Sequence, residues 1–278
     1  MKGRIQALSA LSAALYGLWG AIAAVSLRAG MTAASTGLLI FAFSSIISCA
    51  VLGGRLTVPR MKWVLAGILF AAANYILFSI MSFSYLSSAY VFVPSSVLIF
   101  FIISAWKSRP RGREAFKFSL ALMFIVAGMA VSQITGTEKI NIADLGLGLM
   151  VAFLYGISSY LTAYASKPKA EMTQTFWITL SEMAVFLPLF AITGIRLTYQ
   201  GILLSAIAAL SISAGLYLEL FSYNALTGNR FALMNMVNVL TNLDSMFVAV
   251  ASILLGSFTS FSIFGLVLVF IGASFFLK

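Results

Sequence analysis

The stretch IQALSALSAALYGLWGAIAAVSL, from Ile5 to Leu27, runs without a single charged side chain. A helix rises about 1.5 Å per residue, so about 20 apolar residues are needed to cross the hydrocarbon core of a bilayer. This stretch is long enough, and it exceeds the roughly 7–15 apolar residues of a secretory signal peptide. It therefore predicts a membrane-spanning helix.

Apolar runs of similar length follow one another along all 278 residues, which are 62% hydrophobic and only 9% charged. Soluble domains carry roughly one quarter charged residues, because most of their helices need a water-facing side. The composition predicts an all-α membrane protein. We expect ten transmembrane helices, at approximately 5–27, 33–52, 63–85, 90–106, 118–134, 145–165, 174–195, 201–224, 231–255 and 260–277.

Lysine and arginine are distributed unevenly between the two sides that these ten helices define. With the N-terminus inside, the inner segments hold fourteen of the 17 basic residues, and the outer segments hold only Arg28, Lys139 and Arg196. Cytoplasmic loops of membrane proteins carry such an excess. We expect a multi-pass protein of the cytoplasmic (inner) membrane with both chain ends in the cytoplasm. The net charge of +10 then reflects topology, and no nucleic-acid partner is expected.

The residues present disfavour several reaction classes. The chain has no histidine and one cysteine, Cys49, so it lacks the commonest general base, the commonest metal ligand and any disulfide framework. No Walker sequence for ATP accompanies the spans. An intramembrane enzyme would need paired catalytic groups at one depth, which the sequence does not indicate. We expect no enzyme, no cofactor and no metal site.

Two short sequences recur half a chain length apart. Leu15-Tyr16-Gly17 in the first span recurs as Leu154-Tyr155-Gly156 in the sixth, 139 residues later. Phe83-Ser84-Tyr85 at the end of the third span recurs as Phe221-Ser222-Tyr223 at the end of the eighth, 138 residues later. A nearly constant offset indicates an internal repeat.

The repeat predicts two five-helix units, residues 1–134 and 145–278, joined by an extracytoplasmic linker at 135–144. Because five is odd, the second unit enters the membrane opposite to the first, which gives a 5+5 inverted-topology repeat. Such pairs can rock against each other and expose a central site to each side in turn. The sequence therefore predicts the architecture of a carrier.

The motif Tyr16-x-x-Trp19-Gly20 resembles the opening of the EamA family of the drug/metabolite transporter (DMT) superfamily. The short junction from Ser84 to Ala89 leading into Pro94, the basic segment after the fourth span, and the restart at Gly146-x-Gly148 with Tyr155-Gly156 are also similar to that family. The resemblance covers the whole chain. It implies a ten-helix carrier for amino acids, amines, nucleotide sugars or other metabolites. It also implies a central cavity lined mainly by spans one, three, four, six, eight and nine.

Three of the seven acidic residues fall inside predicted spans: Glu182, Glu219 and Asp244. A carboxylate near mid-membrane costs about 2.5 kcal/mol or more and normally faces a cavity or a partner. No basic residue lies well inside any span. Each acid must therefore be protonated, hydrated, held by polar neighbours or matched with a cationic solute, and we identify the three as candidates for proton or cation coupling. A carboxyl hydrogen-bonded between helices is the alternative role.

Aromatic and asparagine side chains are the candidate substrate-binding residues. Rings in a cavity stack on planar solutes or hold an amine by cation–π attraction, while core packing is the alternative role. Three asparagines after residue 230 share one helical face, at i, i+3 and i+7. The candidates are Tyr16, Trp19, Asn74, Tyr75, Tyr155, Tyr160, Tyr223, Asn235, Asn238 and Asn242.

Together these features predict a secondary active transporter that moves a small organic metabolite, such as an amino acid or an amine, by alternating access. Cationic amines fit the acids, and amino acids fit the asparagine-rich face. A nucleotide-sugar or other metabolite exchanger is one alternative, and a channel or a structural membrane subunit is the alternative from another class. The expected partners are a small-molecule substrate, the lipid bilayer and, if transport is coupled, protons. The protein is expected to be a monomer or a homodimer.

Overall fold

The computed structural model describes residues 2–83, 93, 95–108, 112–132, 142–226, 230–244, 247 and 260–275. Within these ranges the regular structure is α-helical, and no strand occurs. The helices are α1 (Lys2–Arg28), α2 (Ala33–Leu52), α3 (Met61–Phe83), α5 (Ser96–Ser108), α6 (Arg113–Ser132), α7 (Ile142–Ala165), α8 (Glu171–Thr193), α9 (Tyr199–Asn224), α10 (Arg230–Thr241) and α12 (Ser260–Ser274).

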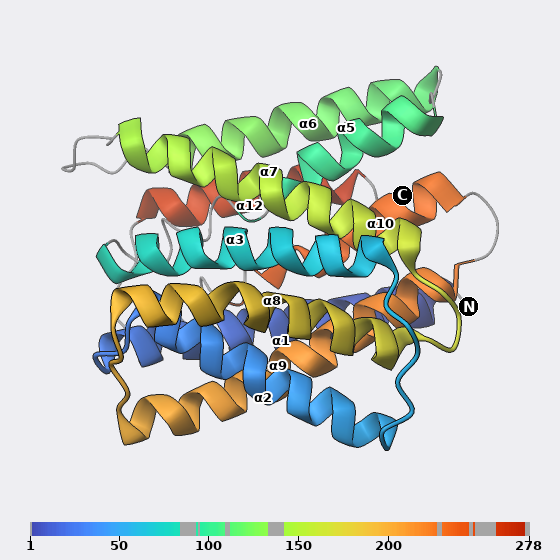
Figure 1. Cartoon of the computed structure of the whole chain (residues 1–278). Coiled ribbons are helices and arrows are strands. Elements are labelled where there is room, and N and C mark those ends of the chain that lie inside the picture. Colours follow the sequence, from blue (N-terminus) through green and yellow to red (C-terminus); the bar gives the residue numbers. More distant parts are fainter. Residues whose placement is uncertain are drawn as a thin grey trace.

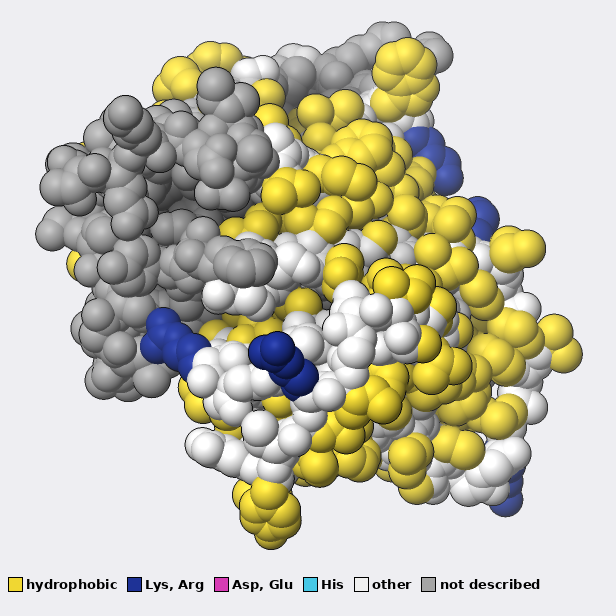
Figure 2. Space-filling model, turned by 60° about the vertical axis from the view of Figure 1, so that its left-hand side comes forward, with side chains coloured by type: hydrophobic (Ala, Val, Ile, Leu, Met, Phe, Trp, Pro, Cys, Tyr) yellow, Lys and Arg dark blue, Asp and Glu magenta, His cyan; other side chains and the backbone are white. Residues whose placement is uncertain are grey.

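Six of these helices, α1, α2, α3, α7, α8 and α9, are long and apolar enough to cross a membrane. Four shorter apolar stretches lie in α5, α6, α10 and α12. Hydrophobic side chains cover much of the face in Figure 2, where few Lys and Arg and no Asp or Glu are visible. Large exposed side chains such as Ile46, Leu187 and Phe264 contribute to the apolar surface of the molecule. Helices satisfy their own backbone hydrogen bonds, so this surface suits lipid, and the chain has the features of a multi-pass membrane protein.

The helices lie roughly side by side and cross the view of Figure 1 from end to end. Helix α1 begins at one end of this bundle, and the connections at 53–60 and 166–170 lie at that end too. The connections at 29–32 and 194–198 lie at the opposite end. The contacting helix pairs are α1 with α9, α3 with α7, α3 with α8, α2 with α9, α5 with α7, α1 with α10, α2 with α8, α6 with α12, and α5 with α10, besides pairs with smaller contacts.

The glycine of each repeated Leu-Tyr-Gly sequence allows the backbone of another segment to pack closely against its helix. A Cβ placed on Gly17 of α1 would lie 2.8 Å from the carbonyl oxygen of Asp244. A Cβ placed on Gly156 of α7 would lie 2.7 Å from the carbonyl oxygen of Ser96. In both cases it would also meet the Cβ of the residue three positions further along. Small residues at such contacts let membrane helices pack backbone to backbone.

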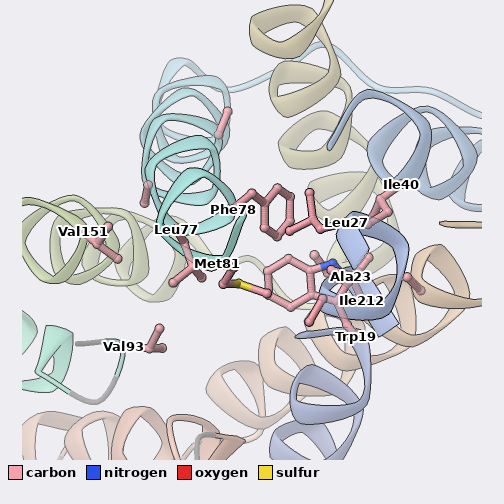
Figure 3. Close-up of a cluster of buried hydrophobic side chains, with 14 of the residues drawn as sticks. Trp19, Ala23, Leu27, Ile40, Leu77, Phe78, Met81, Val93, Val151 and Ile212 are labelled. Atoms are coloured by element: carbon pink, nitrogen blue, oxygen red, sulfur yellow. The ribbon is translucent and has the colours of Figure 1, made fainter. Parts of the chain in front are cut away.

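The largest apolar cluster joins α1, α2, α3, α7, α8 and α9. Figure 3 shows the Trp19 ring beside Met81, with Phe78 next to them, and the Trp19 and Phe78 ring centroids are 6.0 Å apart. Phe186 of α8 is fully buried in the same cluster, with its ring centroid 5.4 Å from that of Phe41. This cluster ties the first three helices to α8.

Two predicted spans differ from the observed helices. The ninth predicted span is continuous over 231–255, but α10 ends at Thr241 and residues 242–243 form a turn. The fourth predicted span covers 90–106, but α5 begins at Ser96, after turn residues at 93 and 95. Polar groups that make local hydrogen bonds occur at both interruptions, such as the Asn242 side chain, which donates to the Asn238 carbonyl. Most of the predicted linker and the junction from Ser84 to Ala89 lie outside the described residues.

Candidate functional site

A cavity of about 60 Å³ lies between α1, α3, α7, α8, α9 and the end of α10. A water molecule needs about 10–15 Å³ measured in this way, so the cavity has room for several waters or for part of a small solute. Its lining residues are Tyr16, Trp19, Phe70, Asn74, Val93, Tyr155, Ser159, Ile178, Glu182, Ile212, Leu216, Glu219, Thr241, Asn242 and Asp244.

The cavity brings together eight of the thirteen candidate residues from the sequence. The three membrane carboxyls, on α8, on α9 and just after α10, all line it. Of the candidate substrate-binding residues, five line it as well. These eight residues are Tyr16, Trp19, Asn74, Tyr155, Glu182, Glu219, Asn242 and Asp244.

The Glu219 carboxyl is held by a tyrosine from another helix. The Tyr16 hydroxyl on α1 donates a hydrogen bond of 2.6 Å to Glu219 Oε2 on α9. Tyr223 lies one helical turn beyond Glu219 and is buried. This short bond ties α1 to α9 where the two helices pack along each other.

The Glu182 carboxyl ends a chain of hydrogen bonds that crosses three helices. The Tyr155 hydroxyl on α7 donates to Asn74 Oδ1 on α3. Asn74 Nδ2 in turn donates to Glu182 Oε1 over 3.3 Å. An ionised carboxylate can only accept, so in that state Glu182 must face the Asn74 nitrogen, which leaves the Asn74 oxygen to accept from the Tyr155 hydroxyl.

Two of the lining residues each carry a buried polar atom that has no hydrogen-bond partner among the described residues. One is Glu182 Oε2, whose side chain is 2% exposed, and the other is Trp19 Nε1, whose side chain is 5% exposed. An atom of this kind usually has a partner, so each is a place where a solute or water can bind.

The interrupted ninth span brings Asn242 and Asp244 to the same cavity. Ser96 Oγ, on the first residue of α5, donates to Asn242 Oδ1 over 3.1 Å. The two interruptions, one before α5 and one after α10, therefore touch each other. Asp244 is buried, and its backbone carbonyl faces Gly17.

Five candidates lie away from the cavity, and most of them pack against other side chains. The Tyr75 ring packs against Phe186, and Tyr160 packs against Phe100 and Tyr164. Asn235 on α10 bonds Ser104 on α5. Asn238 and Tyr223 are also buried, and Tyr223 belongs to the apolar cluster that contains Phe100 and Met234.

Sequence reasoning missed seven lining residues. Five of them lie three or four positions from a candidate residue, in the pairs Phe70 with Asn74, Ser159 with Tyr155, Ile178 with Glu182, Leu216 with Glu219, and Thr241 with Asp244. Side chains at these spacings share a helical face, so the spacing was the available signal. The resemblance implied six lining spans, and the structure adds α8, through Ile178 and Glu182. The missed residues are Phe70, Val93, Ser159, Ile178, Ile212, Leu216 and Thr241.

The ionisable carboxyl and amine groups on the cavity wall are all acidic among its described lining residues. The wall carries three carboxyl groups, and none of its described lining residues is Lys or Arg. Within the described ranges no cluster of His, Cys, Asp and Glu has the arrangement of a metal site. The wall is therefore suited to a cation or to uncharged polar groups rather than to an anion.

Comparison with known proteins identifies the fold only. No protein-family model matches the chain, and no curated protein sequence is similar to it at a significant level. A solved structure described only as "Crystal structure of protein" is similar over 97% of this chain and 96% of its own, with a TM-score of 0.68 and 15% sequence identity. At that identity the likeness concerns the arrangement of helices.

Proposed function

We propose that this chain is a secondary carrier that moves a small organic solute across the cytoplasmic membrane by alternating access. The observation that carries the proposal is the convergence of three membrane carboxyls, from α8, α9 and the segment after α10, on one cavity. Carboxyls inside a membrane protein are costly and mark pathways for substrates, ions or protons. A structural subunit would not need three of them around one cavity.

The helix contacts support a 5+5 inverted repeat. If each helix of residues 1–134 is exchanged with its counterpart five spans later, the α1–α9 pair becomes α7–α3, and the α3–α8 pair becomes α9–α2. Likewise α5–α7 becomes α10–α1, while α2–α8, α6–α12 and α5–α10 each map onto themselves. The contacts of Gly17 and Gly156 exchange in the same way. Two like bundles around a central cavity have the geometry that alternating access needs.

The proposed orientation of the chain in the membrane rests on the distribution of Lys and Arg between the two ends of the bundle. The connections at 53–60 and 166–170, which lie at the end of the bundle where α1 begins, carry Arg55, Arg60, Lys167 and Lys169. Of the described connections at the opposite end, 29–32 carries no basic residue and 194–198 carries Arg196, and α1 ends at that end with Arg28. We therefore propose that both chain ends face the cytoplasm. Membership of the EamA family is proposed on the motifs around Tyr16 and Tyr155.

Flux measurements distinguish a carrier from a channel or a structural subunit. A ligand is first identified by its thermal stabilisation of the purified protein, because a molecule that binds only the folded state raises stability. In proteoliposomes we expect its uptake to saturate and to be accelerated by unlabelled ligand on the opposite side. Uptake that rises without saturation and shows no counterflow would indicate a channel, and the absence of any stabilising ligand and of any flux would contradict the proposal.

Coupling to protons is a second prediction from the same carboxyls. We expect an imposed pH gradient to increase the initial rate of uptake, and we expect Glu219→Gln to lose this acceleration, because an amide cannot carry the proton. Glu182→Gln and Asp244→Asn test the other two groups. Equal flux with and without the gradient, in the wild type and in all three variants, would remove proton coupling and leave a uniporter or exchanger.

A further inference from the structure

The structure separates two classes of solute that both fit the sequence. The asparagine-rich face favours amino acids, but of its three members one, Asn242, lines the cavity. Asn235 bonds Ser104 on α5 instead, and Asn238 does not line the cavity either. The carboxyls that favour amines do line it. The choice between the two classes rests on the proposed carrier function and concerns the solute that the cavity selects.

Glu182 offers a site for a positive charge. Its Oε1 is held by Asn74, and its Oε2 has no partner among the described residues, although the side chain is 2% exposed. Glu219 differs, because it accepts a short hydrogen bond from Tyr16. An ammonium group brings several N–H donors and a charge that offsets the cost of burying the carboxylate. Glu182 is therefore the better placed of the two for a cationic head group.

Trp19 offers a second, different contact. Trp19 lines the same cavity, its buried indole N–H has no partner in the described part of the chain, and an indole can only donate. A bound solute that meets this group must present an acceptor. Among the aromatic side chains, tryptophan also attracts a cation most strongly to the face of its ring.

A carboxylate is a poor choice for that acceptor. No Lys or Arg occurs among the described lining residues, while three acidic side chains do. A solute carboxylate would lose its hydration without gaining a cation, and it would lie near like charges. An uncharged amide or hydroxyl oxygen has neither cost.

We propose that the cavity binds a small amine that carries one positive charge and a neutral hydrogen-bond acceptor, and that it discriminates against the corresponding amino acid. The ammonium group lies against Glu182, and the acceptor accepts from Trp19 Nε1. The solute is small, because the cavity encloses about 60 Å³ in this conformation.

Three small probes test this assignment on the full-length protein in detergent, and two of them, glycinamide and glycine, are nearly equal in size. Glycinamide carries the charge and a neutral acceptor, methylammonium carries the charge alone, and glycine carries the charge and a carboxylate. Binding is measured by titration calorimetry and by thermal stabilisation at pH 7. We expect glycinamide to bind most tightly, and glycine to bind at least about tenfold more weakly than glycinamide. Glycine binding as tightly as glycinamide would overturn the proposal without any variant being made.

Two substitutions locate the site. Glu182→Gln is expected to weaken glycinamide binding by about tenfold or more, because it removes a charge-assisted contact. The matched control is Glu171→Gln, at the start of the same helix and outside the cavity, which should leave binding unchanged. Trp19→Phe should bring glycinamide binding down to the level of methylammonium. Unchanged binding in a folded Glu182→Gln protein would overturn the assignment.

These experiments distinguish an error in the proposed amine site from an error in the proposed carrier function. If glycinamide binds with the expected pattern but shows no counterflow in proteoliposomes, the amine site stands and the carrier function is wrong. If another solute shows saturable counterflow while none of the three probes binds, the carrier function stands and the amine site is wrong.

Discussion

The two proposed halves of the molecule share a scaffold but differ in chemistry. In the first half Gly17 lies against the Asp244 carbonyl, and in the second half Gly156 lies against the Ser96 carbonyl, so each repeated Tyr-Gly sequence makes an equivalent contact. The acids are not shared in this way. All three carboxyls of the cavity come from the second half. At the repeat offset of 138 residues, the position in the first half that corresponds to Glu219 is Met81, which carries no charge.

This difference separates two requirements. Alternating access needs two arrangements of similar energy, and paired helices with like contacts provide them. Binding needs one set of groups that matches one solute, and a single copy of each carboxyl is sufficient for that. The two tyrosines illustrate the point, because Tyr16 bonds a carboxyl on α9 and Tyr155 bonds an amide on α3.

The largest expected effect comes from removing a side chain that packs between the two proposed halves. Phe186 on α8 is fully buried, and its ring lies within 6.3 Å, centroid to centroid, of three rings from α2 and α3. We expect Phe186→Ala to lower the free energy of unfolding by about 3–5 kcal/mol, because it leaves a cavity. Titration with a denaturing detergent measures this. The control, Leu187→Ala, changes a neighbour that is 56% exposed and should have a much smaller effect. Similar losses in both variants would show that Phe186 does not join the halves.

Adding one methyl group at each repeated glycine tests whether the halves are equivalent. We expect Gly156→Ala and Gly17→Ala each to destabilise the fold by about 1–3 kcal/mol, because the new Cβ would press on backbone atoms that cannot move freely. Gly146→Ala and Gly3→Ala are matched controls in the same two helices, since a Cβ there meets nothing within 4 Å. Thermal unfolding in detergent compares the four. A well-tolerated Gly17→Ala beside a damaging Gly156→Ala would contradict the equivalence.

The smallest effect distinguishes the two tyrosines. Tyr16→Phe removes a hydrogen bond to a carboxyl and should cost about 1–2 kcal/mol, while Tyr155→Phe removes one to an amide and should cost about 0.5 kcal/mol. Unfolding free energies of the two variants and of the wild type give the comparison. Equal costs would indicate that the two halves are alike in chemistry as well as in shape.

Much of the helix arrangement could be predicted from the sequence, since most observed helices begin and end within a few residues of the predicted spans. The prediction of a continuous ninth span was wrong at residues 242–243, where α10 has ended and the chain makes a turn. Hydropathy does not register such a break, because the residues on both sides of it are mostly apolar. Within the site, the three carboxyls could be selected by their cost in a membrane. The partners of Tyr16 and of Asn74 could not, because their contacts join residues 203 and 108 positions apart.

The sequence alone determined that the chain is helical and suited to lipid, because an 18-residue apolar stretch must satisfy its backbone within itself wherever it lies. It also determined which side chains are costly to bury. Only the tertiary structure decided which of these groups share a cavity and which pack elsewhere, as Asn242 and Asn235 show. The physical reason is that helical periodicity fixes a side chain's direction about its own helix, while the rotation of each helix against its neighbours depends on packing across the whole bundle.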